Sequence, residues 1–205
     1  ISKIESGRVE LEESSLDLYR MLEEIHLMMY VRVVEKDLDF TVKPSHDLPR
    51  CIRSDLIKLR QVLVNLVGNA IKYTNCGSVE LRAMVTKKES TDLVRLRFEV
   101  EDTGPGIRKE DRAKIFTSFL QLADQITLGD GAGLGLAICR QHVELMDGQI
   151  GVGGEFGKGS IFYFEIPVKV APNEALLTTP HRRVLGLAEE QPHYRILIAE
   201  EHPES

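Results

Sequence analysis

Three polar side chains recur along residues 54 to 74, a segment with the hydrophobic spacing of a helix. At about 100° per residue, Asn65, Asn69 and Lys72 share an arc of about 60°, with Tyr73 at its edge. Amide oxygens can complete the coordination shell of a Mg²⁺ ion that also binds phosphates, and an ammonium group can neutralise those phosphates. The opposite side of the helix carries Leu59, Leu63, Leu66, Val67 and Ala70. On its own, the same pattern is also typical of an ordinary solvated polar face.

A second group with possible chemistry is the motif Asp-Thr-Gly-Pro-Gly-Ile at residues 102 to 107, directly after a predicted strand. A carboxylate at a strand end can accept a hydrogen bond from the exocyclic amine of adenine, and burying Asp102 makes sense with such a partner. Gly104 and Gly106 lack the Cβ atoms that would collide with a flat ring close to the backbone. Taken alone, this motif is also a common turn.

A third motif, Gly-Ala-Gly-Leu-Gly-Leu at residues 131 to 136, opens a predicted helix over residues 133 to 146. Backbone N–H groups at the start of a helix suit phosphate oxygens. A dinucleotide-binding fingerprint would need a strand immediately before the glycines and a parallel βαβ unit after them. Because these glycines follow an irregular stretch and the next strands look antiparallel, the sequence disfavours a dinucleotide site.

The remaining sequence predicts the elements that must position these groups. Residues 16 to 36 form an amphipathic helix, and Ser54 is the expected N-cap of the helix that carries the amides. In the predicted strand over residues 93 to 101, apolar and charged residues alternate, which indicates one buried face and one exposed face. The other expected elements are strands over 9–12, 38–42, 79–85, 149–152 and 160–168, and a short helix over 111–119.

Composition and charge exclude several classes of protein. Of the 205 residues, 42% are hydrophobic and 28% are charged, which is ordinary for a soluble globular protein. The net charge of −6 gives no electrostatic footprint for nucleic acid or for an anionic membrane surface. No apolar run approaches the roughly 20 residues that span a bilayer. The spacing of Cys51, Cys76 and Cys139 fits neither a disulfide framework nor a zinc site, so we expect a reducing, cytoplasmic location.

Taken together, the motifs resemble the ATP-binding catalytic domain of histidine kinases, in the Bergerat-fold ATPase and kinase superfamily. Residues 61 to 74 look like the N box of that family, and residues 102 to 107 look like its G1 box. The F box, the G2 box and the element before the last strand correspond to residues 115–119, 131–136 and 157–162. All five occur in order within residues 8 to 170. The resemblance implies an α/β sandwich, with a mixed, mostly antiparallel sheet, helices on one face and a mobile ATP lid at about residues 120–131.

The resemblance also implies roles for individual residues. Asn69 would coordinate Mg²⁺ with Asn65 beside it, Lys72 and Tyr73 would face the phosphates and the ribose, and Asp102 would read the adenine amine. Asn65 and Lys72 are the expected catalytic residues, and the expected cofactors are ATP and Mg²⁺. The other expected ATP-binding residues are Gly104, Gly106, Ile107, Phe119, Gly131, Gly133, Leu134, Gly135 and Ser160, of which Ser160 would support Asp102.

The predicted reaction is transfer of the γ-phosphoryl group of ATP to a histidine. Hydrolases that resemble this fold place a Glu at the position of Asn65 to activate water, and an amide cannot act as a general base. No histidine of this chain has the flanking residues of a phosphoacceptor, so the acceptor is expected on a dimerisation domain upstream, in a homodimer.

The ends of the chain suggest a hybrid sensor histidine kinase. Residues 1–7 resemble the end of a dimerisation-domain helix, 8–170 the catalytic domain, 171–193 a linker, and 194–205 the first strand of a receiver domain. The expected partners are therefore the dimerisation domain and a receiver domain or response regulator, with no nucleic acid and no membrane contact by this segment.

One departure from the family pattern keeps alternatives open. Lids of this family often carry an Arg or Lys that reaches the γ-phosphate, but no basic residue lies between Lys114 and Arg140, while Asp124 and Asp130 add negative charge. The alternative function is a catalytically weak or inert regulatory scaffold that binds nucleotide. A hydrolase or serine kinase of the same fold is a further alternative, which Asn65 and the flanking segments disfavour.

Overall fold

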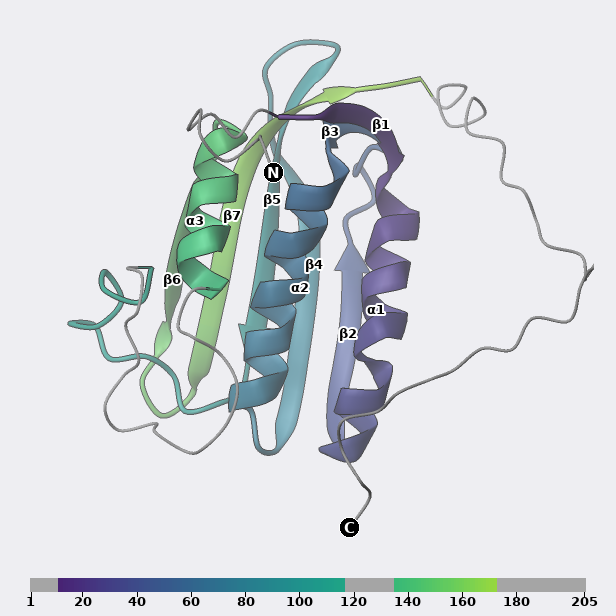
Figure 1. Ribbon diagram of the computed structural model, residues 1–205. Coiled ribbons are helices and arrows are strands. Elements are labelled where there is room, and N and C mark those ends of the chain that lie inside the picture. The colour runs from purple at the N-terminus through teal and green to yellow at the C-terminus, as the bar shows by residue number, and fades with distance from the viewer. Residues whose placement is uncertain (1–10, 117–134, 173–205) are drawn as a thin grey trace, which may run out of the picture.

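The computed structural model describes residues 11–116 and 135–172, which form a seven-stranded sheet with three helices side by side on one face (Figure 1). The strand order is β1-β3-β7-β5-β4-β2, and β6 also pairs with β7. The strands β2 and β4 pair in parallel, and the other described pairs are antiparallel, so the predicted mixed sheet is confirmed. The elements are β1 (Glu13–Asp17), α1 (Leu18–Glu35), β2 (Leu38–Pro44), β3 (Cys51–Asp55), α2 (Leu56–Tyr73), β4 (Gly77–Lys88), β5 (Leu93–Asp102), α3 (Gly135–Leu145), β6 (Gln149–Glu155) and β7 (Gly159–Val170).

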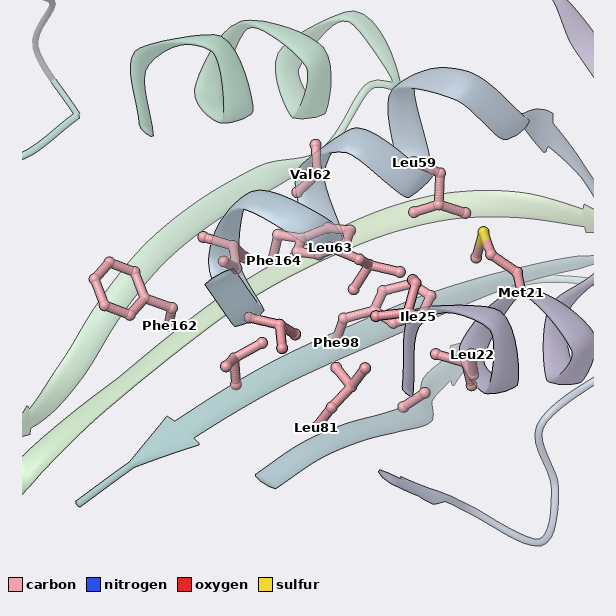
Figure 2. Packing of buried hydrophobic residues seen from close by; sticks show 14 of the residues in the cluster. Met21, Leu22, Ile25, Leu59, Val62, Leu63, Leu81, Phe98, Phe162 and Phe164 are labelled. Atoms are coloured by element: carbon pink, nitrogen blue, oxygen red, sulfur yellow. The ribbon is translucent and has the colours of Figure 1, made fainter. Parts of the chain in front are cut away.

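The core lies between the sheet and the three helices, and Figure 2 shows side chains of α1, α2, β4, β5 and β7 meeting there. Phe98 of β5 and Phe164 of β7 stack at its centre, with ring centroids 4.8 Å apart. Burying apolar surface of this kind is the main favourable contribution to folding. Since α2 packs in the middle of this layer, the core fixes which side of α2 remains available for chemistry.

The face of the sheet opposite the helices carries charged side chains in ion pairs. Arg97 bonds Glu99 at 2.7 Å and Glu165 at 3.0 Å, and its guanidinium lies 4.1 Å from the centre of the Tyr163 ring. Arg82 continues this network towards β4, because it also pairs with Glu99. The alternation of apolar and charged residues predicted for β5 is therefore confirmed.

The sequence analysis missed one strand and placed the N-cap of α2 one residue too early. Cys51–Asp55 forms β3, and Asp55 rather than Ser54 caps the helix, because its Oδ1 accepts the N–H of Lys58 at 3.0 Å. Although burial opposes ionisation, hydrogen bonds from Lys58 and from the Glu12 backbone hold the pKa of Asp55 below its ordinary value. The strand is short and Ser54 and Asp55 are themselves buried in it, so the sequence shows no alternation between apolar and polar residues.

Two other predicted elements differ from the structure. The first described strand is Glu13–Asp17, which buries Leu16. Of the strand predicted over residues 9–12, Leu11 and Glu12 lie outside any strand, and residues 9 and 10 lie outside the described residues. Of the helix predicted over residues 111–119, residues 111–116 form successive turns in which Ile115 and Phe116 are buried, and residues 117–119 lie outside the described residues. The other predicted strands and helices are confirmed where the structure describes them, with ends shifted by a few residues. The expected helix over 1–7, the lid, and the expected linker from residue 173 and receiver strand lie outside the described residues.

Candidate functional site

The predicted polar side of α2 exists in the structure. Asn65 and Asn69 are half-buried and Lys72 and Tyr73 are exposed, while the residues predicted to dock on the sheet are buried. The Lys72 ammonium lies 5.6 Å from the centre of the Tyr73 ring, so these two side chains lie together at the C-terminal end of the helix. The helix therefore presents two amides, an ammonium and a phenol along one side.

The C-terminal turn of α2 is held by a lysine from another helix. The ammonium of Lys36, which caps α1, donates to the backbone oxygens of Ile71 at 2.9 Å, Lys72 at 2.6 Å and Thr74 at 3.2 Å. The last carbonyls of a helix lack partners within the helix and carry its negative partial charge, so an ammonium stabilises them. Lys36 thereby fixes the backbone from which Lys72 and Tyr73 project.

Asp102 ends β5 in a buried position, with 6% of its surface exposed. It lies opposite Ser160 in the ladder between β5 and β7, and its Oδ1 accepts the N–H groups of Gly104 at 2.9 Å and Ser160 at 3.3 Å. The Ser160 hydroxyl also bonds the carboxyl group. Burial raises the pKa of Asp102 above its ordinary value, although the hydrogen bonds from Gly104 and Ser160 oppose this shift. An ionised carboxylate has about four acceptor positions, so this group retains capacity for another donor.

The loop after Asp102 packs against the end of α2. A Cβ on Gly104 would lie 2.8 Å from Asp102 Oδ1, 3.1 Å from the backbone oxygen of Tyr73 and 3.3 Å from Thr74 Oγ1. The structure therefore brings together two motifs about 30 residues apart, since Asp102 and Gly104 lie beside the last residues of the amide-bearing helix.

The same loop is also fastened to the hairpin between β6 and β7. Gly106 has a φ of +70°, and a Cβ there would lie 2.4 Å from the backbone oxygen of Glu155, so the hairpin itself requires a glycine. Ile107 packs against the core, and Arg112 donates to its backbone oxygen at 3.4 Å and to that of Gly154 at 2.6 Å. These contacts place the whole segment from Asp102 to Arg112 against β6 and β7.

The start of α3 lies against Asn65. A Cβ on Gly135 would come within 3.9 Å of the Asn65 amide. The Cys139 thiol, one turn further along α3, lies close to the same amide and donates to the backbone oxygen of Val62 at 3.9 Å. Burial raises the pKa of the Cys139 thiol to about 11, so this cysteine is a packing residue rather than a nucleophile. Of the third motif, the structure describes Gly135 and Leu136, while Gly131, Gly133 and Leu134, together with Phe119, lie outside the described residues.

Three residues that matter for this site escaped the sequence analysis: Lys36, Thr74 and Gly159. Thr74 follows α2 and is fully buried, and Gly159 has a φ of +129° with no space for a Cβ, which would lie 1.9 Å from the backbone oxygen of Asp102. Gly159 was noted only as part of a motif, and Lys36 acts across 35 residues of sequence, so no local pattern could identify it. Two hollows among the described residues, of about 340 and 250 Å³, lie elsewhere, so the chemistry of the side chains rather than cavity size points to this site.

Comparison with known families identifies the domain. Residues 54–170 match the family described as histidine kinase-, DNA gyrase B- and HSP90-like ATPases. The chain belongs to this family. Relatives that match more than four fifths of this chain are named as histidine kinases, so the chain contains the ATP-binding catalytic domain of a histidine kinase. None of the helices in residues 11–116 and 135–172 is long and apolar enough to cross a membrane.

Curated relatives of this catalytic domain are much longer signalling proteins. The sensory/regulatory protein RpfC of Xanthomonas campestris is 36% identical over 171 residues, which are 83% of this chain and 24% of RpfC. The hybrid signal transduction protein dokA of Dictyostelium discoideum is 39% identical over 176 residues, which are 83% of this chain and 10% of dokA. The chain thus spans a quarter or less of the length of these relatives.

Solved structures of histidine kinases share the fold. Full-length ShkA, crystallised in complex with AMPPNP, superposes with a TM-score of 0.69 and is 40% identical, covering 80% of this chain and 32% of ShkA. The nucleotide-free catalytic domain of ThkA gives a TM-score of 0.62 at 30% identity, covering 76% of this chain and 95% of that domain. The match therefore extends over nearly the whole of the ThkA catalytic domain.

Proposed function

We propose that the chain binds Mg²⁺-ATP and transfers its γ-phosphoryl group to a histidine on a dimerisation domain of the same protein. The observation that carries this proposal is the buried carboxyl group of Asp102, with spare acceptor capacity, beside the end of a helix that presents two amides and an ammonium. A buried charge is costly unless a partner compensates it. The names of the relatives and the AMPPNP bound to ShkA support a nucleotide as that partner.

Adenine would be recognised by Asp102. Its carboxylate would accept a hydrogen bond from the exocyclic amine. Gly104, where a Cβ would lie 2.8 Å from Asp102 Oδ1, lets the loop pass close enough for its N–H to hold that carboxylate. Guanine carries an oxygen in place of that amine, and two acceptors facing each other in a buried position repel each other. The site should therefore prefer ATP to GTP, and the Ser160 hydroxyl would keep the carboxyl group in place.

The phosphates would extend along α2 towards the start of α3. Asn69 and Asn65 supply neutral amide oxygens, which suit a Mg²⁺ ion whose other ligands are phosphate oxygens and water. The bound ion would supply charge neutralisation and hold the phosphates in position. Lys72 would neutralise phosphate charge, and the backbone N–H groups near Gly135 would point at phosphate oxygens. Phosphoryl transfer depends mainly on positioning and charge stabilisation, which these groups provide.

Transfer of the phosphoryl group to a histidine, rather than to water, is proposed because residue 65 is an asparagine. The amide lies beside Cys139 and Gly135, and neither the amide nor a thiol with a pKa of about 11 can serve as the general base for a water molecule at neutral pH. We therefore propose slow ATP hydrolysis by this domain and an acceptor histidine on the dimerisation domain. The relatives are named as kinases, which favours this function over an inert regulatory scaffold.

The proposed partners are the dimerisation domain and a receiver domain. ThkA has been crystallised in complex with the response regulator TrrA, and dokA and histidine kinase B of Dictyostelium discoideum are named as hybrid proteins. We accordingly interpret residues 1–7 as part of a dimerisation-domain helix, residues 171–193 as a linker and residues 194–205 as part of a receiver domain.

A transfer assay with radiolabelled ATP tests this function. The chain would be mixed with the dimerisation domain of its parent protein, and label should appear on that domain in the presence of Mg²⁺, but not on this chain alone. Asn69→Ala and Lys72→Met should each slow labelling at least about 100-fold, because each removes a charge-stabilising contact. Lys88→Met, an exposed change on β4, is the matched control and should label normally. Rapid phosphate release without labelled protein would contradict the proposal.

A further inference from the structure

The outward side of α1 carries apolar side chains that no described element covers. Leu27, Tyr30, Val31 and Val34 recur at helical spacing within an arc of about 100°. Their exposed fractions lie between 59 and 64%, whereas the residues on the opposite side of the helix are buried in the core. The solvent side of such a helix is ordinarily polar, and a contiguous exposed apolar patch marks a site of interaction. We call these four residues the α1 stripe.

The α1 stripe ends beside exposed carboxylates. Glu35 is the last residue of α1, and Asp37 and Asp39 follow it in the turn and at the start of β2. Arg32 is also exposed here, while the ammonium of Lys36 is bonded to the backbone oxygens at the end of α2. The surface thus combines an apolar stripe with a negative end, so it fits a segment in which basic residues adjoin aliphatic ones.

The chain leaves the sheet beside the start of α1. The N–H of Ala171, just after β7, donates to the backbone oxygen of Cys51 at 2.9 Å, and the N–H of Leu18 donates to that of Arg50 at 2.8 Å. Eleven residues separate Ala171 from Arg182, and an extended chain of that length spans about 38 Å. Because α1 has 18 residues and is about 27 Å long, the segment from residue 182 onwards can reach the far end of the stripe.

That segment has the matching composition. Residues 182–187 read Arg-Arg-Val-Leu-Gly-Leu, whereas flexible linkers are ordinarily rich in Gly, Ser or Pro and do not need aliphatic residues. We propose that residues 182–187 dock on the α1 stripe, with the aliphatic side chains against the stripe and the two arginines beside the carboxylates. The covalent connection raises the effective concentration of this segment to about the millimolar range, so a patch of about two helical turns can hold it. The inference goes beyond the proposed function and does not require bound nucleotide.

Amide hydrogen exchange of the full chain tests the docking. In the wild type, the amides of residues 182–187 should exchange at least about tenfold more slowly than those of an unstructured peptide of the same sequence. The double substitution Leu27→Gln with Val31→Gln should abolish this protection, since glutamine keeps the helix propensity but removes the apolar surface. Val184→Gln with Leu185→Gln should abolish it as well. Ile57→Gln changes an isoleucine of α2 that is 70% exposed and lies outside the stripe, so this matched control should keep the protection.

Circular dichroism should show the same helix content in all these variants, because the substituted helical side chains are exposed. Protection that is absent from the wild type, or that persists when the stripe is substituted, would overturn the inference. Sedimentation of the same samples distinguishes the other occupants. A dimer that Leu27→Gln with Val31→Gln dissociates would assign the stripe to a second copy of the chain, and a monomer with unprotected residues 182–187 would assign it to a different protein. Either result would contradict the proposed docking.

Discussion

The outer face of the sheet and the buried end of β5 are both built from polar side chains, but they satisfy them differently. On the outer face, Arg97 bonds Glu99 and Glu165. Although burial opposes ionisation of Glu99, hydrogen bonds from Arg97 and Arg82 hold the pKa of Glu99 below its ordinary value. At the end of β5, burial raises the pKa of Asp102, and the neighbouring Thr74 hydroxyl has no partner among the described residues. Both regions include residues of β5, because Arg97 and Glu99 belong to its outer face and Asp102 is its last residue.

We interpret this difference as a division between polar groups that stabilise the fold and polar groups that are proposed to bind the nucleotide. Paired charges at a surface compensate one another and contribute modestly to stability. A buried carboxylate lowers stability until another molecule bonds to it. Substitutions that remove these polar side chains should therefore have opposite consequences in the two regions. On the outer face they should lower stability and spare ATP binding, whereas removal of the Asp102 carboxylate should weaken binding and spare stability.

The largest effect should come from the backbone beneath Asp102. Gly159→Ala would place a Cβ 1.9 Å from the backbone oxygen of Asp102 at a φ of +129°, so we expect a loss of about 3 kcal/mol of unfolding free energy and loss of ATP binding. Gly157→Ala is the matched control, because Gly157 also has a positive φ, +88°, but no atom lies within 4 Å of the added Cβ. It should cost about 1 kcal/mol and leave binding intact. Urea unfolding measures the stability of both variants, and equal losses of unfolding free energy would show that the contact with Asp102 is unimportant.

A smaller effect is expected at the C-terminal turn of α2. Lys36→Met removes the ammonium that bonds the backbone oxygens of Ile71, Lys72 and Thr74, so the unfolding free energy should fall by about 2 kcal/mol. ATP affinity should fall a few-fold as well, since this turn carries Lys72 and Tyr73. Chemical denaturation and nucleotide titration check the two parts, with Lys88→Met as the control. Unchanged stability would mean that the three carbonyls do not depend on Lys36.

The smallest effect is expected on the outer face. Arg97→Met removes ion pairs to Glu99 and Glu165 and the contact with the Tyr163 ring, and should lower the unfolding free energy by about 1 kcal/mol. The loss should shrink in high salt, because salt screens charges at a surface. ATP affinity should stay within about twofold of wild type, since binding does not use this face. A large loss of ATP affinity would break the contrast between the two regions.

The sequence predicted the elements that repeat a simple pattern. The helix with Asn65, Asn69 and Lys72 on one side and the alternation along β5 are confirmed, because their periodicity follows from burial on one side. β3 was missed because Ser54 and Asp55 are polar and yet buried, and Asp55 bonds the backbone of Glu12 across 43 residues of sequence. The proximity of Thr74 to Asp102, and the support of α2 by Lys36, depend on tertiary contacts across about 28 and 35 residues that no local pattern encodes.

The most direct test of the central claim compares wild type with Asp102→Asn in both ATP titration and unfolding. With Mg²⁺ present, the substitution should weaken ATP binding at least about 30-fold, because an amide N–H₂ cannot accept from the adenine amine. At neutral pH it should leave stability unchanged or raise it by about 1 kcal/mol, since it removes a buried charge.

The pH dependence of that comparison has a definite sign. The folded-state pKa of Asp102 is raised, so ionisation destabilises the fold, and the advantage of Asp102→Asn should be absent below about pH 4, the range of an unfolded aspartate. The advantage should grow as pH rises through the raised pKa. If Asp102→Asn instead binds ATP like the wild type, or lowers stability as substitution of an ion-paired residue would, then the Asp102 carboxylate does not bind the nucleotide.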